Sequence, residues 1–157
     1  MFLSVAFVLA ATVYGGTSMP IDKESLALNG RWSVQDTCLC ASAPAVSVAF
    51  KAVTGEVTFD IEGEARFLFE TDGKPQKYVT VTDRKKQKFS TPKDGKSHTY
   101  RLVKVSESNP GKICVRDISL AKGGTFGERP KQSNRRIEFI GDSFTVGYGV
   151  EGKGPED

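Results

Sequence analysis

A serine in a glycine-rich turn near the C-terminus is the residue of this chain best suited to do chemistry. The run Gly141-Asp142-Ser143 directly follows the apolar stretch 135–140. A serine on a tight turn at the C-terminal end of a buried strand is where an α/β sheet presents a nucleophile. Gly141 would permit the turn, and the backbone N–H of Ser143, at the start of a helix, would help to bind an oxyanion. The pattern indicates acyl transfer by a serine hydroxyl.

The elements that must support this turn are short β-strands. Between about residues 28 and 120 apolar and polar residues alternate with a period close to two, and the dipeptides Asp72-Gly73 and Asp94-Gly95 are typical of tight turns. The expected strands cover 46–50, 57–61, 67–69, 78–81, 99–105 and 113–120. Each such strand has one apolar face to bury against a second sheet, so the pattern predicts a β-sandwich.

Other conspicuous side chains in this region are interpreted as structural. Trp32, Tyr78 and Tyr100 could stack on sugar rings, but aromatic residues in strands usually belong to the core. His98 alternates with Tyr100 and is expected to be a strand histidine rather than a general base. The basic run 84–88 is expected to be a solvated hairpin tip rather than a binding patch.

The N-terminus is typical of an export signal. Residues 1–18 contain no charged side chain, and an apolar run covers 2–13. Spanning a bilayer takes about 20 apolar residues, so this run fits the apolar region of a signal peptide better than an anchor. Cleavage is expected after Gly16 or Ser18, which predicts a secreted, extracellular protein. An N-terminal core strand or helix is the alternative.

The three cysteines are consistent with export. In an oxidising compartment Cys114 is expected to pair with either Cys38 or Cys40, which leaves one thiol free. Three separate buried thiols are the alternative. The spacing of Cys38 and Cys40 is not that of a zinc site, and the only histidine is far away in sequence, so we expect no metal and no other cofactor.

The composition fits one ordinary domain with a short extension. Of the 157 residues 38% are hydrophobic and 26% are charged, as in a typical globular protein. A formal net charge of +3 is too small to favour nucleic acid or an anionic membrane as a partner. The sequence leaves the oligomeric state open.

The stretch from Ile137 to Gly149 resembles the first conserved block of the GDSL or SGNH hydrolases. A secreted β-sandwich joined directly to that block is similar, more narrowly, to the family two carbohydrate esterases. The resemblance implies a jelly-roll-like β-sandwich followed by an α/β domain that removes acetyl groups from plant polysaccharides. It also implies that Ser143 is the nucleophile, that Asp142 shapes the turn, and that the Ser143 amide is an oxyanion donor.

The resemblance further implies a histidine base and additional oxyanion donors in blocks that follow this one. The only histidine of the chain precedes the motif. We therefore expect a signal peptide at 1–18, a β-sandwich at 19–130, and the start of a truncated SGNH domain at 131–157. A serine hydroxyl without a base is a poor nucleophile at neutral pH, so this chain is expected to be inactive on its own.

Three functions are open at this point. The first is a secreted carbohydrate esterase whose partner is an acetylated polysaccharide or oligosaccharide. The second is a non-catalytic glycan-binding or spacer module, and the third is an interaction domain in which Gly141-Asp142-Ser143 is accidental. In each case neither nucleic acid nor, after signal removal, a membrane is expected as a partner.

Overall fold

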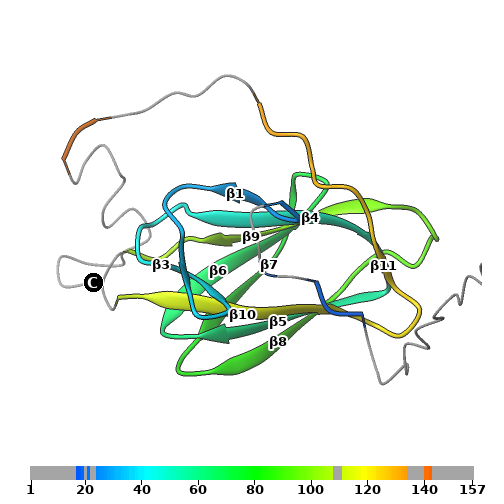
Figure 1. Ribbon diagram of the computed structural model, residues 1–157, viewed down its shortest axis with the longest axis horizontal. Helices are drawn as coiled ribbons and strands as arrows, with labels where there is room; N and C mark the ends of the chain where they lie inside the picture. The colour runs from blue at the N-terminus through cyan, green and yellow to red at the C-terminus, as the bar shows by residue number, and fades with distance from the viewer. Residues whose placement is uncertain (1–16, 20, 22–23, 108–110, 134–139, 143–157) are drawn as a thin grey trace, which may run out of the picture.

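The computed structural model describes residues 17–19, 21, 24–107, 111–133 and 140–142. Within these residues eleven strands form two packed antiparallel sheets (Figure 1). In strand order the first sheet contains β1 (Ala27–Asn29), β4 (Ser47–Val53), β9 (His98–Lys104), β6 (Ala65–Thr71) and β7 (Lys74–Val81), and β11 (Thr125–Phe126) pairs with β4. The second sheet contains β2 (Ser33–Gln35), β3 (Cys38–Ala41), β10 (Ile113–Leu120), β5 (Glu56–Glu62) and β8 (Lys85–Ser90). These residues contain no helix, and thus none that could cross a membrane. The predicted β-sandwich is confirmed as a mainly β fold.

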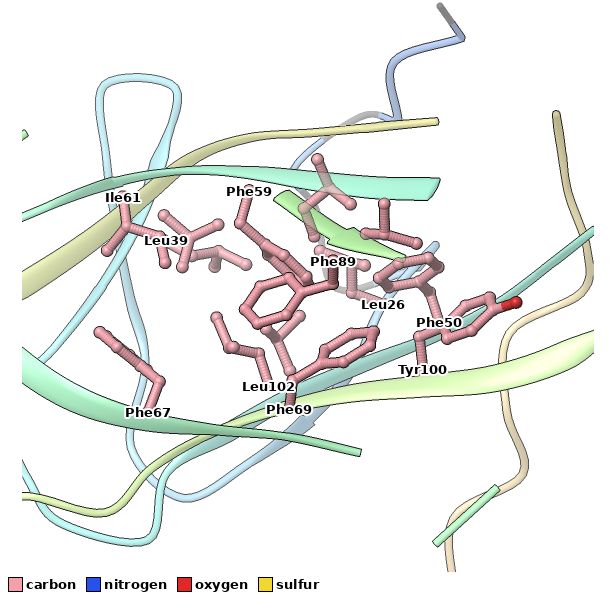
Figure 2. Close-up of a cluster of buried hydrophobic side chains, with 14 of the residues drawn as sticks. Leu26, Leu39, Phe50, Phe59, Ile61, Phe67, Phe69, Phe89, Tyr100 and Leu102 are labelled. Atoms are coloured by element: carbon pink, nitrogen blue, oxygen red, sulfur yellow. The ribbon is translucent and has the colours of Figure 1, made fainter. Parts of the chain in front are cut away.

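The period-two pattern of the sequence is the pattern of burial. Val57, Phe59 and Ile61 of β5 are fully buried between the sheets, as the alternation predicted. Figure 2 shows aromatic rings from both sheets meeting in this space. The ring of Phe69 stacks on that of Phe89 with centroids 4.2 Å apart, and on that of Tyr100 at 6.0 Å. Apolar burial of this kind contributes about 25 cal/mol for each Å² removed from water, so the core holds the two layers together.

The Asp72-Gly73 dipeptide makes the predicted tight turn. Asp72 has φ 52° and Gly73 has φ 74°, and Thr71 of β6 is paired with Lys74 of β7. Two consecutive residues with positive φ form the hairpin turn whose twist matches that of the flanking strands. Gly95 also has positive φ, at 72°. At both positions the local sequence supplies residues that adopt the positive φ angles of the backbone.

Two expectations about side chains were wrong. The basic run 84–88 is not a hairpin tip, because β7 belongs to the first sheet and β8 to the second. Most of the run forms β8, an edge strand, where charged side chains discourage pairing with another chain. Tyr78 is not a core residue, since it is 47% exposed on the outer face of β7. Trp32 is partly buried against the core, and Tyr100 is fully buried, as expected.

Residues 17–19 run antiparallel to β10. The N–H of Met19 donates to the carbonyl of Ile118 at 3.0 Å, and the N–H of Leu120 donates to the carbonyl of Thr17 at 3.0 Å. Ser18 is paired with Ser119. The predicted signal peptide lies outside the described residues except for Thr17 and Ser18, which are part of the folded sheet edge.

A disulfide joins two neighbouring strands of the second sheet. Cys40 of β3 and Cys114 of β10 occupy paired positions and are bonded, whereas Cys38 is a buried free thiol. The prediction that Cys114 pairs with one of the two N-terminal cysteines is thereby confirmed, and the pairing is specified. The alternative of three separate thiols is excluded.

We predict that only one cysteine of the oxidised, denatured protein reacts with iodoacetamide, and that it is Cys38. Cys40→Ala should lower the free energy of unfolding by about 4 kcal/mol, because the bond closes a loop of 74 residues in the unfolded chain. Cys38→Ala is the matched control and should cost much less. Peptide mass spectrometry and urea unfolding test both statements, and alkylation of all three thiols would contradict them.

Candidate functional site

The predicted nucleophile motif is only partly described. Gly141 and Asp142 are exposed, with Asp142 at a bend, and the preceding Ile140 is 91% exposed and outside any strand. Ser143 and the rest of the predicted strand 135–140 lie outside the described residues. The roles of Ser143 as nucleophile and oxyanion donor, and of Asp142 in the turn, therefore stay predictions.

His98 is held through both of its ring nitrogens. Nδ1 lies 2.6 Å from Oδ2 of Asp72, and Nε2 lies 3.0 Å from Oδ1 of Asp94. The second carboxylate oxygen of Asp72 accepts the backbone N–H of Thr99 at 2.9 Å. The imidazole thus ties the β6–β7 turn and the turn before β9 to the first residue of β9. Sequence reasoning had located both aspartates as turn residues, but not as partners of the histidine.

The carboxylates of this cluster engage both ring nitrogens of His98 and shift the pKa values of all three groups. Its pKa is raised first by the hydrogen bond to Asp72 and then by that to Asp94. The pKa of Asp72 is lowered by His98 and by the Thr99 N–H, and the pKa of Asp94 is lowered by the Lys96 N–H and by His98. Because both ring nitrogens already lie within hydrogen-bond distance of a carboxylate, neither is directed at a substrate proton. The expectation of a structural strand histidine agrees with this geometry.

A second charged cluster fixes the start of β8. Arg84 donates from Nε and Nη2 to the two carboxylate oxygens of Asp60, at 3.1 and 2.7 Å. This bidentate contact lowers the pKa of Asp60, which is nearly buried in β5. Lys88 pairs with Glu56 at 3.1 Å. Part of the basic run is therefore engaged in holding the edge strand to its neighbour.

The outer face of the first sheet carries the one described tyrosine with a broadly exposed ring. The guanidinium carbon of Arg66 lies 4.7 Å from the ring centroid of Tyr78, a cation–π contact. Arg101 lies on β9, on the other side of β6 from Tyr78. It donates from Nη1 to Glu70 at 3.3 Å and from Nε to Oγ of Ser47 at 3.1 Å. Tyr78 therefore offers an exposed aromatic ring with one guanidinium group in contact with it. The sequence analysis gives Tyr78 as a candidate for stacking on sugar rings. It does not show that Arg66 lies against the ring.

A shallow groove between β2 and β3 has a structural explanation. It is lined by Trp32, Gln35 and Lys112, among others. The indole N–H of Trp32 donates to the carbonyl of Asn29 at 2.9 Å, and Nζ of Lys112 donates to Oε1 of Gln35 at 2.8 Å. These polar groups satisfy one another. Across the described ranges no cluster of three or more histidine, cysteine, aspartate or glutamate side chains could hold a metal ion.

The comparisons with known proteins agree with the mainly β fold described above. No protein-family model matches the sequence. The cellulase/esterase CelE of Acetivibrio thermocellus is 31% identical over 139 residues, which cover 86% of this chain and 17% of that protein. A family two carbohydrate esterase from Cellvibrio japonicus matches 90% of this chain and 44% of its own, with a TM-score of 0.77 and 21% identity. A family two carbohydrate esterase from Clostridium thermocellum, solved in complex with cellohexaose, matches 82% of this chain and 41% of its own, with a TM-score of 0.75 and 26% identity.

The structural neighbours are family two carbohydrate esterases. The chain spans less than half the length of these solved structures, and 17% of the length of CelE. The likeness therefore covers the β-sandwich and supports the resemblance stated from the sequence. The α/β hydrolase segment stays a prediction.

We predict that the histidine cluster makes stability depend on pH above neutrality. A raised histidine pKa contributes stability that is complete below the unfolded pKa of about 6.5 and is lost as the pH rises through the folded pKa. The melting temperature of the protein should fall as the pH rises above about 6.5, and His98→Gln should remove this fall. The lowered pKa of Asp72 acts in acid, where stability is lost as the pH drops below about 4. Calorimetric melting curves that run parallel for the two proteins above pH 6 would contradict the prediction.

Proposed function

We propose that the chain is the β-sandwich portion of a secreted carbohydrate esterase that removes acetyl groups from polysaccharide in its full-length form. The observation that carries the proposal is the likeness to the Clostridium thermocellum family two esterase, at 26% identity and a TM-score of 0.75. The Gly141-Asp142-Ser143 run after an apolar stretch supports it independently, because it supplies the residue types that acyl transfer needs. The 31% identity to the cellulase/esterase CelE also supports the proposal of an esterase.

In the proposed reaction Oγ of Ser143 attacks the carbonyl carbon of the acetyl ester. A base takes the serine proton, and the Ser143 N–H donates to the oxyanion that develops on the former carbonyl oxygen. The sugar alcohol leaves with a proton, and water then hydrolyses the acetyl-serine. His98 does not supply the base, because Asp72 and Asp94 occupy both of its nitrogens. The base in this proposal is the histidine that the resemblance places in the longer protein.

A non-catalytic glycan-binding role is the second candidate. The exposed ring of Tyr78 beside Arg66 favours it, since an exposed aromatic ring is available to stack on a sugar ring. The two roles are compatible, because a β-sandwich that holds polysaccharide would raise the substrate concentration near an attached catalytic centre. In both roles the partner is a polysaccharide or oligosaccharide.

We predict that the exported protein begins at Thr17. Cleavage after Gly16 keeps the Ser18–Ser119 bridge and the hydrogen bond from Leu120 to Thr17, whereas cleavage after Ser18 removes both. Expression with the native N-terminus in a secreting host, followed by N-terminal sequencing of the protein from the medium, measures the start. A protein that begins at Met19, or one that stays in the cell with residues 1–16 attached, would contradict the prediction.

The esterase proposal is tested by extending the reading frame. The genomic sequence downstream of codon 157 should continue in frame and contain an Asp-x-x-His pattern. The longer protein should hydrolyse p-nitrophenyl acetate and acetylated xylan, and Ser143→Ala should reduce kcat by at least about a thousandfold. Ser42→Ala, at an exposed loop position of the sandwich, is the matched control and should leave kcat unchanged.

The 157-residue chain alone is expected to show no turnover that depends on Ser143. Ester hydrolysis by this chain that Ser143→Ala abolishes would refute the requirement for an external base. A longer protein whose activity is indifferent to Ser143→Ala would refute the esterase proposal itself.

A further inference from the structure

At three places in the described part of the chain an asparagine or aspartate stands directly before a glycine. These pairs are Asn29-Gly30 at the end of β1, Asp72-Gly73 between β6 and β7, and Asp94-Gly95 before β9. In such a pair the backbone nitrogen of the glycine can attack the side-chain carbonyl carbon of the residue before it, because glycine has no side chain that hinders the approach. The surroundings of each pair determine whether this reaction can occur.

The two aspartates are held as carboxylates. Oδ2 of Asp72 lies 2.6 Å from Nδ1 of His98, and its Oδ1 accepts the N–H of Thr99 at 2.9 Å. Oδ1 of Asp94 accepts the N–H of Lys96 at 3.0 Å and lies 3.0 Å from Nε2 of His98. The hydrogen bond to His98 lowers the pKa of Asp72, and the Lys96 N–H and then His98 lower the pKa of Asp94. An ionised carboxylate held by hydrogen bonds is a poor electrophile, so these two pairs are protected.

Asn29 lacks this protection. It is the exposed last residue of β1, and its side chain is a neutral amide. Its backbone carbonyl accepts the indole N–H of Trp32 at 2.9 Å. Among the described residues neither the Asn29 carboxamide nor the N–H of Gly30 has a hydrogen-bond partner. The attacking nitrogen and the amide carbon are therefore adjacent, and no other bond engages either group.

The fold requires the glycine of this pair. Gly30 has φ +81°, a backbone conformation that other residues rarely adopt. A Cβ atom at this position would lie 2.7 Å from Cγ1 of Val46, which is buried in the core. The residue after Asn29 must therefore lack a side chain, and the unhindered nitrogen is a consequence of the fold.

We propose that Asn29 is a site of self-modification, at which the chain converts a neutral amide into aspartate and isoaspartate with water as the co-reactant. The nitrogen of Gly30 forms a bond to Cγ of Asn29, and the bond from Cγ to Nδ2 breaks. The proton of the attacking nitrogen leaves with Nδ2 as ammonia, and the product is a cyclic imide, a succinimide. Water then opens the ring at either carbonyl carbon. Cleavage of the new bond to Cγ gives aspartate, whereas cleavage of the original peptide bond gives isoaspartate, and neither step needs an oxidant or a reductant.

The modification changes the edge of the first sheet. Both products carry a negative charge where Asn29 is neutral, and isoaspartate adds a methylene group to the main chain. The added methylene disturbs the pairing of Asn29 with Ser47 and moves the carbonyl that Trp32 binds. The neighbouring carbonyl of Leu28 accepts Nε2 of Gln132 at 2.7 Å. The reaction therefore acts where the segment after β11 is attached to the sandwich, and the inference does not depend on the proposed function.

Timed incubation of the 157-residue protein at mildly alkaline pH, followed by peptide mass spectrometry, tests the proposal. The peptide that contains Asn29 should gain the mass difference between an amide and an acid, and hydroxylamine should cut the chain after Asn29 while the succinimide is present. Asn29→Gln is the matched variant and should show neither change, because its longer side chain would have to close a larger ring. Asn109 and Asn134 are internal controls, since Pro110 has no N–H and Arg135 carries a side chain.

Trp32 provides a second readout, because it is the only tryptophan of the chain. Its fluorescence emission should shift in step with the loss of Asn29 and should stay constant in Asn29→Gln. His98→Gln removes a partner of both Asp72 and Asp94. In that variant isoaspartate should appear at the two aspartate pairs, where the parent protein should form none.

A short peptide with the sequence Leu-Asn-Gly-Arg, that of residues 28–31, calibrates the reaction without the fold. Retention of Asn29 in the protein through an incubation that converts this peptide would overturn the proposal, because the fold would then protect the amide. Isoaspartate that forms at Asp72 or Asp94 of the parent protein as fast as at Asn29 would overturn it as well.

Discussion

Stacking of aromatic rings between the two sheets is the interaction on which the rest of the structure depends. Phe69 of β6 lies against Phe89 of the opposite sheet and against Tyr100 of its neighbour, at centroid distances of 4.2 and 6.0 Å. Side chains on a strand alternate between faces, so a shift of one residue in β6 would exchange Phe69 for the charged Glu70. The core therefore sets the register of the first sheet, and the register sets which residues share its outer face.

Charged groups then fix the ends and edges of the sandwich. His98 links two turns through Asp72 and Asp94, and Arg84 holds β8 to β5 through Asp60. These groups fix the positions of the turns and of β8 but add little to the free energy of unfolding, because exposed ion pairs are screened by water. The single histidine of the chain has both ring nitrogens within hydrogen-bond distance of carboxylates, so it is placed to link the two turns and not to act as a general base.

The sequence predicted those features whose cause is local. Alternation located the long strands, and Asp72-Gly73 located a turn, because both depend on residues adjacent in the chain. It did not find that Arg66 lies against Tyr78, since that contact depends on the register of β6 with β7. For the same reason β8 was mistaken for a hairpin tip: a charged edge strand lacks the apolar face by which strands are recognised. Cys40 could be distinguished from Cys38 only by the pairing of β3 with β10.

We propose two roles for two parts of the chain: glycan contact at the exposed Tyr78 ring of the first sheet, and acyl transfer at Ser143 in a longer protein. The Tyr78 ring is the part that the described residues determine, and NMR titration of the ¹⁵N-labelled 157-residue protein with a soluble glucomannan oligosaccharide tests it most directly. Amide shifts should change around Tyr78 of β7 and Arg66 of β6, and not along β8. Changes confined to Lys85 and Lys86, or no changes at saturating oligosaccharide, would contradict it.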